Sequence, residues 1–178
     1  VIITGSQLPI GEVRTDGEEN LITALQIAAA RDKDGEPMIQ EVAILFEDYL
    51  WRGNRSTKMS ADYFNAFKSN NFPFLARIGL GIHFHKEALW RQKAHRPLKV
   101  QTEMDRNVMF IHLFPGITEQ TLQYLTNTPG IKGIVLKTYG AGNALTDKWF
   151  VDLMRAAVKR GVVVVNVSQC VNGGVNSE

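Results

Sequence analysis

Short apolar runs alternate with amphipathic stretches along the chain, and this alternation predicts repeated strand–helix units. We expect strands at Val1–Thr4, Glu41–Leu45, Val108–Phe114, Gly133–Tyr139 and Val162–Val165. Because the last run is apolar and β-branched throughout, it predicts a strand that is covered on both faces. Continuous apolar strands that alternate with helices are typical of parallel βαβ units, so the pattern favours an α/β fold with mainly parallel sheets.

Two helices are expected in the first half of the chain. Asp16 is the expected N-cap of the first helix, and Leu21, Leu25 and Ala28 recur at the spacing of its buried face. A second helix is expected over Ser60–Lys68, where aromatic residues form the apolar stripe.

The second half of the chain predicts two further helices. Thr118 and Thr146 are their expected N-caps, and Gly161 is the expected residue that ends the last helix. Between the two halves, residues 81–106 are polar and basic, with one short ribbon expected at Gly81–Phe84. The pattern therefore predicts two α/β domains, at residues 1–80 and 107–178, joined by a connector at 81–106.

The composition narrows the classes of function. The chain has 20 Lys+Arg and 18 Asp+Glu, and a net charge of +2 gives no basic field for nucleic-acid binding. A single cysteine excludes an internal disulfide and permits a reducing compartment. No apolar run approaches the ~20 residues that span a bilayer, so we expect no membrane partner. The chain opens on Val1 inside a predicted strand, and we expect it to be part of a longer protein.

Polar loops follow the predicted strands. In parallel sheets, ligands bind beyond the carboxyl ends of the strands. The loops expected there are Gly5–Pro9, Asp48–Lys58, Tyr139–Ala144 and Ser168–Gly174. They are rich in Gly, Asn, Ser, Thr and Gln, which suits a small polar ligand. Periodicity and composition alone thus predict a two-lobed α/β protein with a small-ligand site at the strand ends.

Individual residues in these loops leave several alternatives open. Lys58 is either a catalytic amine with a lowered pKa or an exposed surface lysine. Cys170 is either a nucleophile or a thiol that lines a ligand site. His83 and His85 share one face of the predicted ribbon, but no further metal ligand accompanies them, and no metal is expected. Gly140 and Gly142 begin a dinucleotide fingerprint that Leu145 interrupts, so we expect no nucleotide cofactor.

Taken together, the loops resemble those of type I, cytoplasmic bacterial L-asparaginases. The segments that carry the resemblance are Val1–Pro9, Arg14–Gly17, Arg52–Lys58, Phe114–Ile117, Tyr139–Ala144 and Val163–Cys170. The resemblance covers nearly the whole chain. It implies a cytoplasmic homotetrameric enzyme with two Rossmann-like α/β domains, each incomplete in this chain, that hydrolyses L-asparagine to L-aspartate and ammonia without a cofactor.

The resemblance also assigns roles to individual residues. It implies that Lys58 is the lysine of a triad with a second threonine and an aspartate, beside a separate threonine nucleophile. Some members bind asparagine at a second, allosteric site, and the positions that match it are Thr57, Lys137, Ser168, Gln169 and Cys170. The family usually has arginine at the position of Lys137, and lysine offers a ligand carboxylate a point charge where arginine offers a planar fork.

Two family segments are missing from this chain. The Thr-Gly-Gly-Thr segment would carry the nucleophile, and the Gly-Thr-Asp-Thr segment would carry the second threonine and the aspartate; neither is present. We therefore expect the 178-residue chain to be inactive by itself. The alternatives are a related glutamine amidohydrolase or amidotransferase subunit, and a non-catalytic α/β protein that binds a small amino acid.

Overall fold

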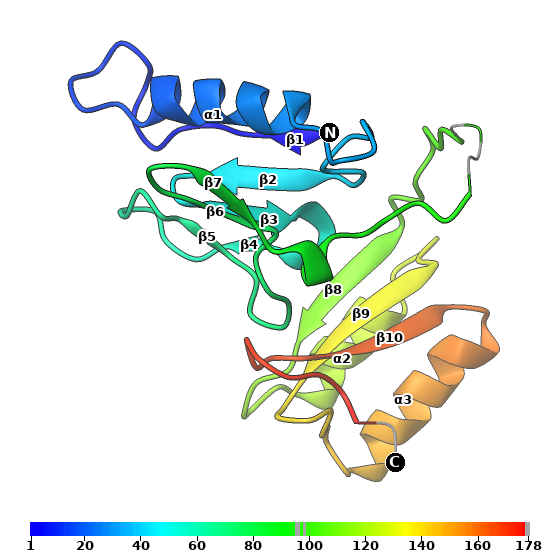
Figure 1. The fold of residues 1–178 in the computed structure, drawn as a ribbon. Helices are drawn as coiled ribbons and strands as arrows, with labels where there is room; N and C mark the ends of the chain where they lie inside the picture. The colour runs from blue at the N-terminus through cyan, green and yellow to red at the C-terminus, as the bar shows by residue number, and fades with distance from the viewer. Residues whose placement is uncertain (95–96, 98, 177–178) are drawn as a thin grey trace. The chain divides into compact units, whose positions relative to one another are not determined.

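The chain folds into two compact units. The computed structural model describes residues 1–94, 97 and 99–176, and it divides the chain into Val1–Pro97 and Leu98–Glu178 (Figure 1). Residues 95, 96 and 98 of the predicted connector, and residues 177 and 178, lie outside the described residues. The α/β class predicted from the sequence is confirmed.

The first unit is built on a five-stranded sheet in the order β1-β2-β3-β6-β7, with β4 and β5 as a separate pair. Its elements are β1 (Ile2–Ile3), α1 (Gly17–Ala29), β2 (Ala43–Phe46), β3 (Tyr49–Arg52), β4 (Thr57–Lys58), β5 (Phe67–Lys68), β6 (Ala76–Ile78) and β7 (Ile82–Phe84), with short 3-10 helices at Gly53–Arg55 and Lys86–Ala88. The predicted ribbon at Gly81–Phe84 is confirmed as β7, which pairs with β6.

Only β1 and β2 are parallel in this sheet, whereas the other three pairs are antiparallel. The prediction that Asp48–Lys58 is one loop was wrong, because Tyr49–Arg52 forms β3. Glu47 and Asp48 alone join β2 to β3, and so short a turn permits only an antiparallel pair. The sequence signal was weak because β3 is bounded by charged residues.

Helix α1 forms where it was predicted, but it buries a different face. Leu21, Leu25 and Ala28 are exposed, whereas Asn20, Thr23, Ala24 and Ile27 are among its buried residues. The buried set has the i, i+3, i+4, i+7 spacing of one helix face, and small side chains let the helix lie close to the sheet. Asp16 is at the N-cap position, but its side chain makes no capping hydrogen bond.

The helix predicted over Ser60–Lys68 is absent; the segment is a series of bends that leads into β5. The Ser60 hydroxyl accepts hydrogen bonds from the main-chain N–H groups of Asp62 and Tyr63, which closes a local turn. The N–H groups of Met59 and Ser60 donate to the carbonyl of Ala66, so the backbone bonds of the segment follow a loop pattern.

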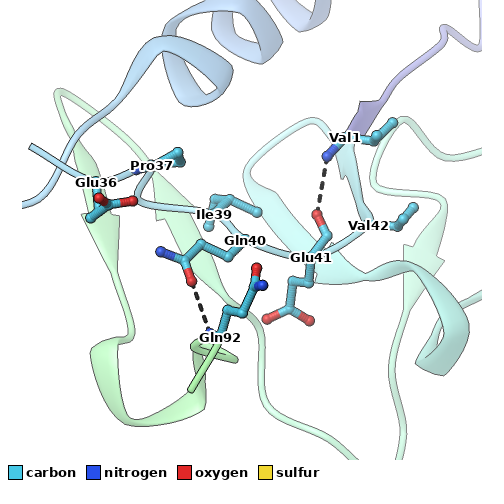
Figure 2. Close-up of a pocket in the computed structure, with 8 residues that line it drawn as sticks. All are labelled: Val1, Glu36, Pro37, Ile39, Gln40, Glu41, Val42 and Gln92. Carbon is cyan, nitrogen blue, oxygen red and sulfur yellow. Dashed lines mark hydrogen bonds between the residues drawn. The ribbon is translucent and has the colours of Figure 1, made fainter. Parts of the chain in front are cut away.

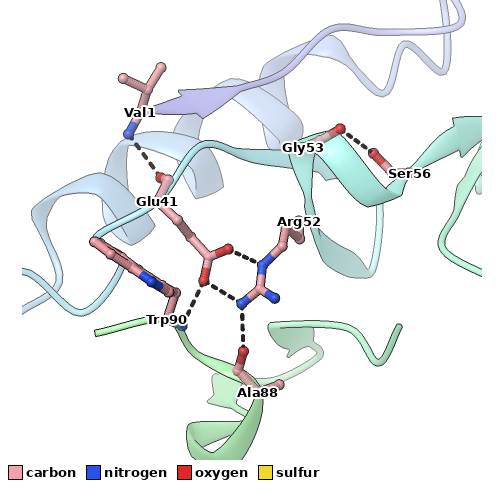
Figure 3. Close-up of polar contacts among 7 residues, drawn as sticks. All are labelled: Val1, Glu41, Arg52, Gly53, Ser56, Ala88 and Trp90. Atoms are coloured by element: carbon pink, nitrogen blue, oxygen red, sulfur yellow. Dashed lines mark hydrogen bonds and ion pairs between the residues drawn. The ribbon is translucent and has the colours of Figure 1, made fainter. Parts of the chain in front are cut away.

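A partly buried ion pair joins Glu41, just before β2, to Arg52 at the end of β3 (Figure 3). The two side chains make a bidentate contact, and the Glu41 carboxylate also accepts the Trp90 N–H at 2.8 Å. Arg52 donates to the Ala88 carbonyl at 2.8 Å and lies over the Phe72 ring, 4.2 Å from its centroid. These contacts hold the segment after β7 against the sheet.

The second unit contains a three-stranded parallel sheet in the order β10-β9-β8. Its elements are β8 (Val108–His112), α2 (Glu119–Thr126), β9 (Gly133–Thr138), α3 (Lys148–Lys159) and β10 (Val163–Ser168). Thr118 caps α2 as predicted, because its side chain accepts the Thr121 N–H. Helix α3 begins after Asp147 and has no side-chain cap, so the cap predicted at Thr146 was wrong. Gly161 has φ +86° just after α3, as a C′ glycine does.

Among the described residues, one face of this sheet is open. The core contains Ile111, Ile134 and Leu136 from the sheet with Leu122 and Phe150 from the helices. The alternate side chains point away from this core, and Phe110 is 61% exposed and Val163 is 64% exposed. The sequence predicted that the strand at Val162–Val165, now β10, is covered on both faces. That prediction does not hold within the described part of the unit.

Candidate functional site

The loop after β1 and the strand β4 meet in the first unit. Lys58 is exposed in β4, and its ammonium group donates a hydrogen bond to Gln7 Oε1 at 2.7 Å. Gln7 lies in the predicted loop Gly5–Pro9, beyond the carboxyl end of β1. Because β1 and β2 are parallel, this is the edge at which parallel sheets place ligands. The structure thus locates Lys58 at a strand-end site.

Gln7 is the residue that organises this site, and sequence reasoning did not single it out. Its side-chain amide donates to the carbonyls of Ala61 and Tyr63 at 3.0 and 2.9 Å, while its oxygen accepts from Lys58. One carboxamide therefore fixes the segment that carries the lysine at three points. The signal was present as a long amide side chain in a strand-end loop, but nothing in the sequence shows which segment it contacts.

Thr57 precedes Lys58 in β4 and is also exposed. In the antiparallel pair of β4 and β5, Thr57 lies opposite Lys68 and Lys58 lies opposite Phe67. Successive side chains of a strand point to opposite faces, so Thr57 points away from the face on which Lys58 reaches Gln7.

Four of the predicted allosteric residues lie at the ends of β9 and β10 in the second unit. Ser168 donates to the Gly140 carbonyl and accepts the Cys170 N–H at 2.9 Å. Gln169 donates from its side chain to the carbonyls of Leu113 and Lys137. The side-chain N–H groups of Gln169 thus connect the segment after β8 to β9. The side-chain oxygen of Gln169 is the atom of this amide that can accept a hydrogen bond from a ligand.

Lys137 and Cys170 are the members of this group with an amine and a thiol side chain. Lys137 is half-buried in β9, on the opposite face of the sheet from the buried Leu136. Cys170 is a free, exposed thiol. The structure groups Lys137, Ser168, Gln169 and Cys170 in one unit, while Thr57 belongs to the other unit.

The Gly140–Gly142 segment is a tight turn after β9. Gly140 and Gly142 have φ +48° and +116°, and a Cβ on Gly142 would lie 2.7 Å from a Val175 methyl group. Both glycines are therefore required by backbone conformation or by close packing, as the sequence suggested when the nucleotide fingerprint broke off at Leu145.

Metal ligation finds no support among the described residues. No group of three or more His, Cys, Asp or Glu side chains there is placed to hold a metal ion. His83 lies in β7 and His85 follows it, with no carboxylate closer than Glu87, which is 3.7 Å from His85 Nε2. None of the described helices is both long and apolar enough to cross a lipid bilayer.

A surface hollow at the opposite end of β2 does not belong to this site (Figure 2). It is lined by Val1, Glu36, Pro37, Ile39, Gln40, Glu41, Val42 and Gln92. Gln40 accepts the Gln92 N–H at 2.9 Å, and Glu41 accepts a hydrogen bond from the Val1 amino group through its carbonyl oxygen. The hollow lies at the amino end of β2, whereas ligands of parallel sheets bind at the carboxyl end.

Family models match both units. The model described as Asparaginase, N-terminal matches residues 1–90, and the Glutaminase/Asparaginase C-terminal domain matches residues 107–178. The chain belongs to the asparaginase family. The boundaries predicted from the sequence, 1–80, 81–106 and 107–178, remain a prediction for the domains of this asparaginase-family chain.

Proteins with different names resemble this asparaginase-family chain. "L-asparaginase 1" of Escherichia coli (strain K12) is 37% identical over 185 residues, which cover 99% of the chain and 50% of the relative. The "60 kDa lysophospholipase" of Mus musculus is 35% identical over all of the chain and 30% of its own length. The crystal structure of L-asparaginase I from Vibrio cholerae superposes with a TM-score of 0.88 at 36% identity, over 99% of the chain and 52% of that structure. The chain spans between 30% and 52% of the length of these relatives.

Glu47 is strained and electrostatically unfavourable in this asparaginase-family chain. It has φ +51° in the turn between β2 and β3, a conformation that costs a residue with a side chain about 1 kcal/mol. Burial raises the pKa of its carboxyl group, and the charges of Asp16, Asp48 and Glu19 raise it further. The native state therefore holds this proton more tightly than the unfolded state, and stability falls as pH rises from the unfolded pKa through the native one.

Glu47→Gly is expected to stabilise the first unit by about 1 kcal/mol at neutral pH, because glycine adopts positive φ without strain. Urea unfolding followed by the fluorescence of Trp51 and Trp90, in a Trp149→Phe background, measures the change. Glu47→Gln, which keeps the strain and removes the charge, separates the two causes, and its gain should vanish at low pH. A Glu47→Gly protein that is no more stable than its parent would contradict the strain.

Proposed function

We propose that this chain is part of an L-asparaginase that hydrolyses L-asparagine to L-aspartate and ammonia. The observation that carries the proposal is the position of Lys58 at the carboxyl edge of the first sheet, with its ammonium group held by Gln7, in a chain of the asparaginase family. A lysine there is placed to take part in proton transfer at a small polar substrate.

The proposed reaction uses a threonine outside the present sequence. Its hydroxyl attacks the side-chain amide carbon, ammonia leaves with a proton, and water hydrolyses the acyl-enzyme ester to release aspartate. Lys58 takes part in proton transfer within the triad and so helps to activate the threonine hydroxyl. No cofactor is required, because each step is nucleophilic substitution with proton transfer.

We also propose that Thr57, Lys137, Ser168, Gln169 and Cys170 contribute to a second asparagine site. Lys137 is half-buried, and its ammonium group is the group among them that would pair with the ligand carboxylate. The side-chain N–H groups of Gln169 already bind main-chain carbonyls, so its oxygen would receive the ligand ammonium group.

The full-length protein is proposed to be cytoplasmic and to assemble as a dimer or tetramer. Parallel sheets are ordinarily covered on both faces, and the face of the second sheet that carries Phe110 and Val163 is open among the described residues. This open face supports the proposal that further protein, from the same chain or from another subunit, covers it.

A glutamine amidohydrolase is the second candidate, because the family description for residues 107–178 names glutaminase as well as asparaginase. Comparing kcat/KM of the full-length protein for L-asparagine and L-glutamine tests the choice. We expect asparagine to be preferred, and a higher kcat/KM for glutamine would replace the proposal with this candidate. Binding of either amino acid without turnover would favour the non-catalytic alternative.

A further inference from the structure

Two buried polar residues at the start of α1 connect the loops around Lys58. Asp16 is 6% exposed and Asn20 is 3% exposed, and the Asn20 side chain donates to the Asp16 carboxylate at 3.1 Å. Their other side-chain hydrogen bonds go to main-chain groups of other segments. Buried polar side chains cost stability unless their hydrogen bonds are made, so this pair is kept in place by the loops it binds.

The Asp16 carboxylate binds the main-chain N–H groups of the loop after β1. It accepts from the Gln7 N–H at 2.9 and 3.0 Å and from the Leu8 N–H at 3.1 Å. Thr15 holds the same loop from its carbonyl side, because its hydroxyl donates to the Leu8 carbonyl at 3.1 Å. The main chain at Gln7 and Leu8 is thus fixed on both sides by residues at the helix start.

Asn20 binds the first residue of the same loop and joins it to the turn after β2. Its side-chain amide donates to the Gly5 carbonyl at 2.9 Å, and its oxygen accepts the Glu47 N–H at 3.0 Å. The carboxyl ends of β1 and β2 are therefore joined through one side chain, in addition to the strand pairing.

Gln7 links these contacts to Lys58. Its main chain is fixed by Asp16, and both polar ends of its side chain are occupied by the segment that contains Lys58, Ala61 and Tyr63. A shift of the Gln7 main chain would therefore move the oxygen that receives the Lys58 ammonium group.

We propose that Asp16 and Asn20, together with Thr15, are positioning residues for Lys58, acting through the main chain of Gln7 and Leu8. The inference rests on the proposed function in so far as it gives Lys58 a role in turnover, but the geometry it describes is independent of the reaction. An Asp16→Asn side chain has one acceptor oxygen in place of two and turns an NH₂ group toward donors. The Gln7–Leu8 loop would then be released although the side chain keeps its size.

The test measures the environment of Lys58 directly. The 178-residue chain and its Asp16→Asn and Thr15→Val variants are acylated at low conversion with an N-hydroxysuccinimide ester, and peptide mass spectrometry compares Lys58 with Lys68 as internal reference. We expect the ratio to rise about threefold or more in both variants, because Lys58 loses a hydrogen-bond acceptor. Thr23→Val, which removes a buried hydroxyl from α1 outside these contacts, should leave the ratio unchanged.

Turnover by the full-length protein gives the second readout. There we expect kcat to fall about tenfold in Thr15→Val and to stay within twofold in Thr23→Val, at similar unfolding midpoints. If Asp16→Asn does not fold, Thr15→Val decides alone. An unchanged Lys58 ratio in folded variants would overturn the inference. Full turnover by a Lys58→Met protein would instead remove the proposed role of Lys58, and the acylation result would still decide the positioning.

Discussion

Replacing Lys58 with methionine in the full-length protein is expected to lower kcat for L-asparagine by about 10³-fold or more, the size of loss that follows removal of one member of a catalytic unit. The fold should persist, because the side chain is exposed and its one described hydrogen bond goes to Gln7. Ammonia release under substrate saturation measures kcat, and circular dichroism checks the fold.

Lys68→Met is the matched control for this experiment. Lys68 is exposed on β5, the strand that pairs with β4, and its removal takes the same charge from the same ladder. We expect it to keep kcat within a factor of about two, since surface charges contribute little. Lys58→Arg should be as inactive as Lys58→Met, because arginine stays protonated. Near-normal ammonia release by Lys58→Met would exclude the lysine from the mechanism.

Arg52→Met is expected to destabilise the first unit by about 2 kcal/mol, because it leaves the partly buried Glu41 carboxylate without its charged partner. Part of the loss comes from the Ala88 carbonyl and the Phe72 ring, which Arg52 also contacts. Urea unfolding, followed by the fluorescence of Trp51 and Trp90 in a Trp149→Phe background, measures the change.

The pH dependence of that loss identifies its cause. Burial alone would raise the pKa of Glu41, but hydrogen bonds from Arg52 and Trp90, with the charge of Arg52, bring it below its ordinary value. The stability that Glu41 contributes is therefore present above its unfolded pKa and is lost as pH falls through its native pKa. In Arg52→Met the pKa of Glu41 is no longer lowered by Arg52. The loss of unfolding free energy caused by Arg52→Met should therefore be smaller at acid pH, where the Glu41 carboxyl group is protonated.

An exposed lysine of the same unit provides the control for this stability measurement. Lys68 lies on β5, and its side chain is exposed. Lys68→Met should leave the free energy of unfolding of the first unit nearly unchanged, because exposed charges contribute little. If Arg52→Met cost no more than Lys68→Met, the contacts of Glu41 and Arg52 would not stabilise the sheet.

Helix α1 shows what periodicity reveals and what it leaves open. The N-cap expected at Asp16 and the apolar spacing predicted a helix, and Gly17–Ala29 is one. The same spacing selected Leu21 and Leu25 for the buried face, which was wrong. The buried face is set by tertiary contacts of Asn20 with the strand-end loops, and hydrophobicity along the chain carries no record of those contacts.

The helix predicted over Ser60–Lys68 was wrong for a related reason. Aromatic residues at helical spacing favoured a helix, but the carbonyls of Ala61 and Tyr63 accept hydrogen bonds from Gln7. A long-range side chain therefore takes carbonyls that a helix would have used, and tertiary bonds override local propensity. The second sheet was predictable because each of its strands contains at least three consecutive apolar residues next to a recognisable helix. The apolar residues of β3 lie between Asp48 and Arg52 in a polar segment, and this strand was not predicted.

The candidate site divides in the same way. Lys58 was found through the resemblance of its loop, and the strand-end loops were found from topology. Gln7, Asp16 and Asn20 were not selected as site residues, because their importance lies in bonds between segments that are distant in sequence. Amide and carboxyl side chains are common in loops, and only the structure shows which of them are buried and shared.

Ammonia release from L-asparagine by purified full-length protein, beside the 178-residue chain at equal concentration, tests the central claim most directly. We predict saturable turnover by the full-length protein, with aspartate formed in equal amount, and none by the 178-residue chain. Absence of ammonia from the full-length protein, or turnover by the 178-residue chain alone, would contradict the proposed asparaginase and its threonine nucleophile outside the present sequence.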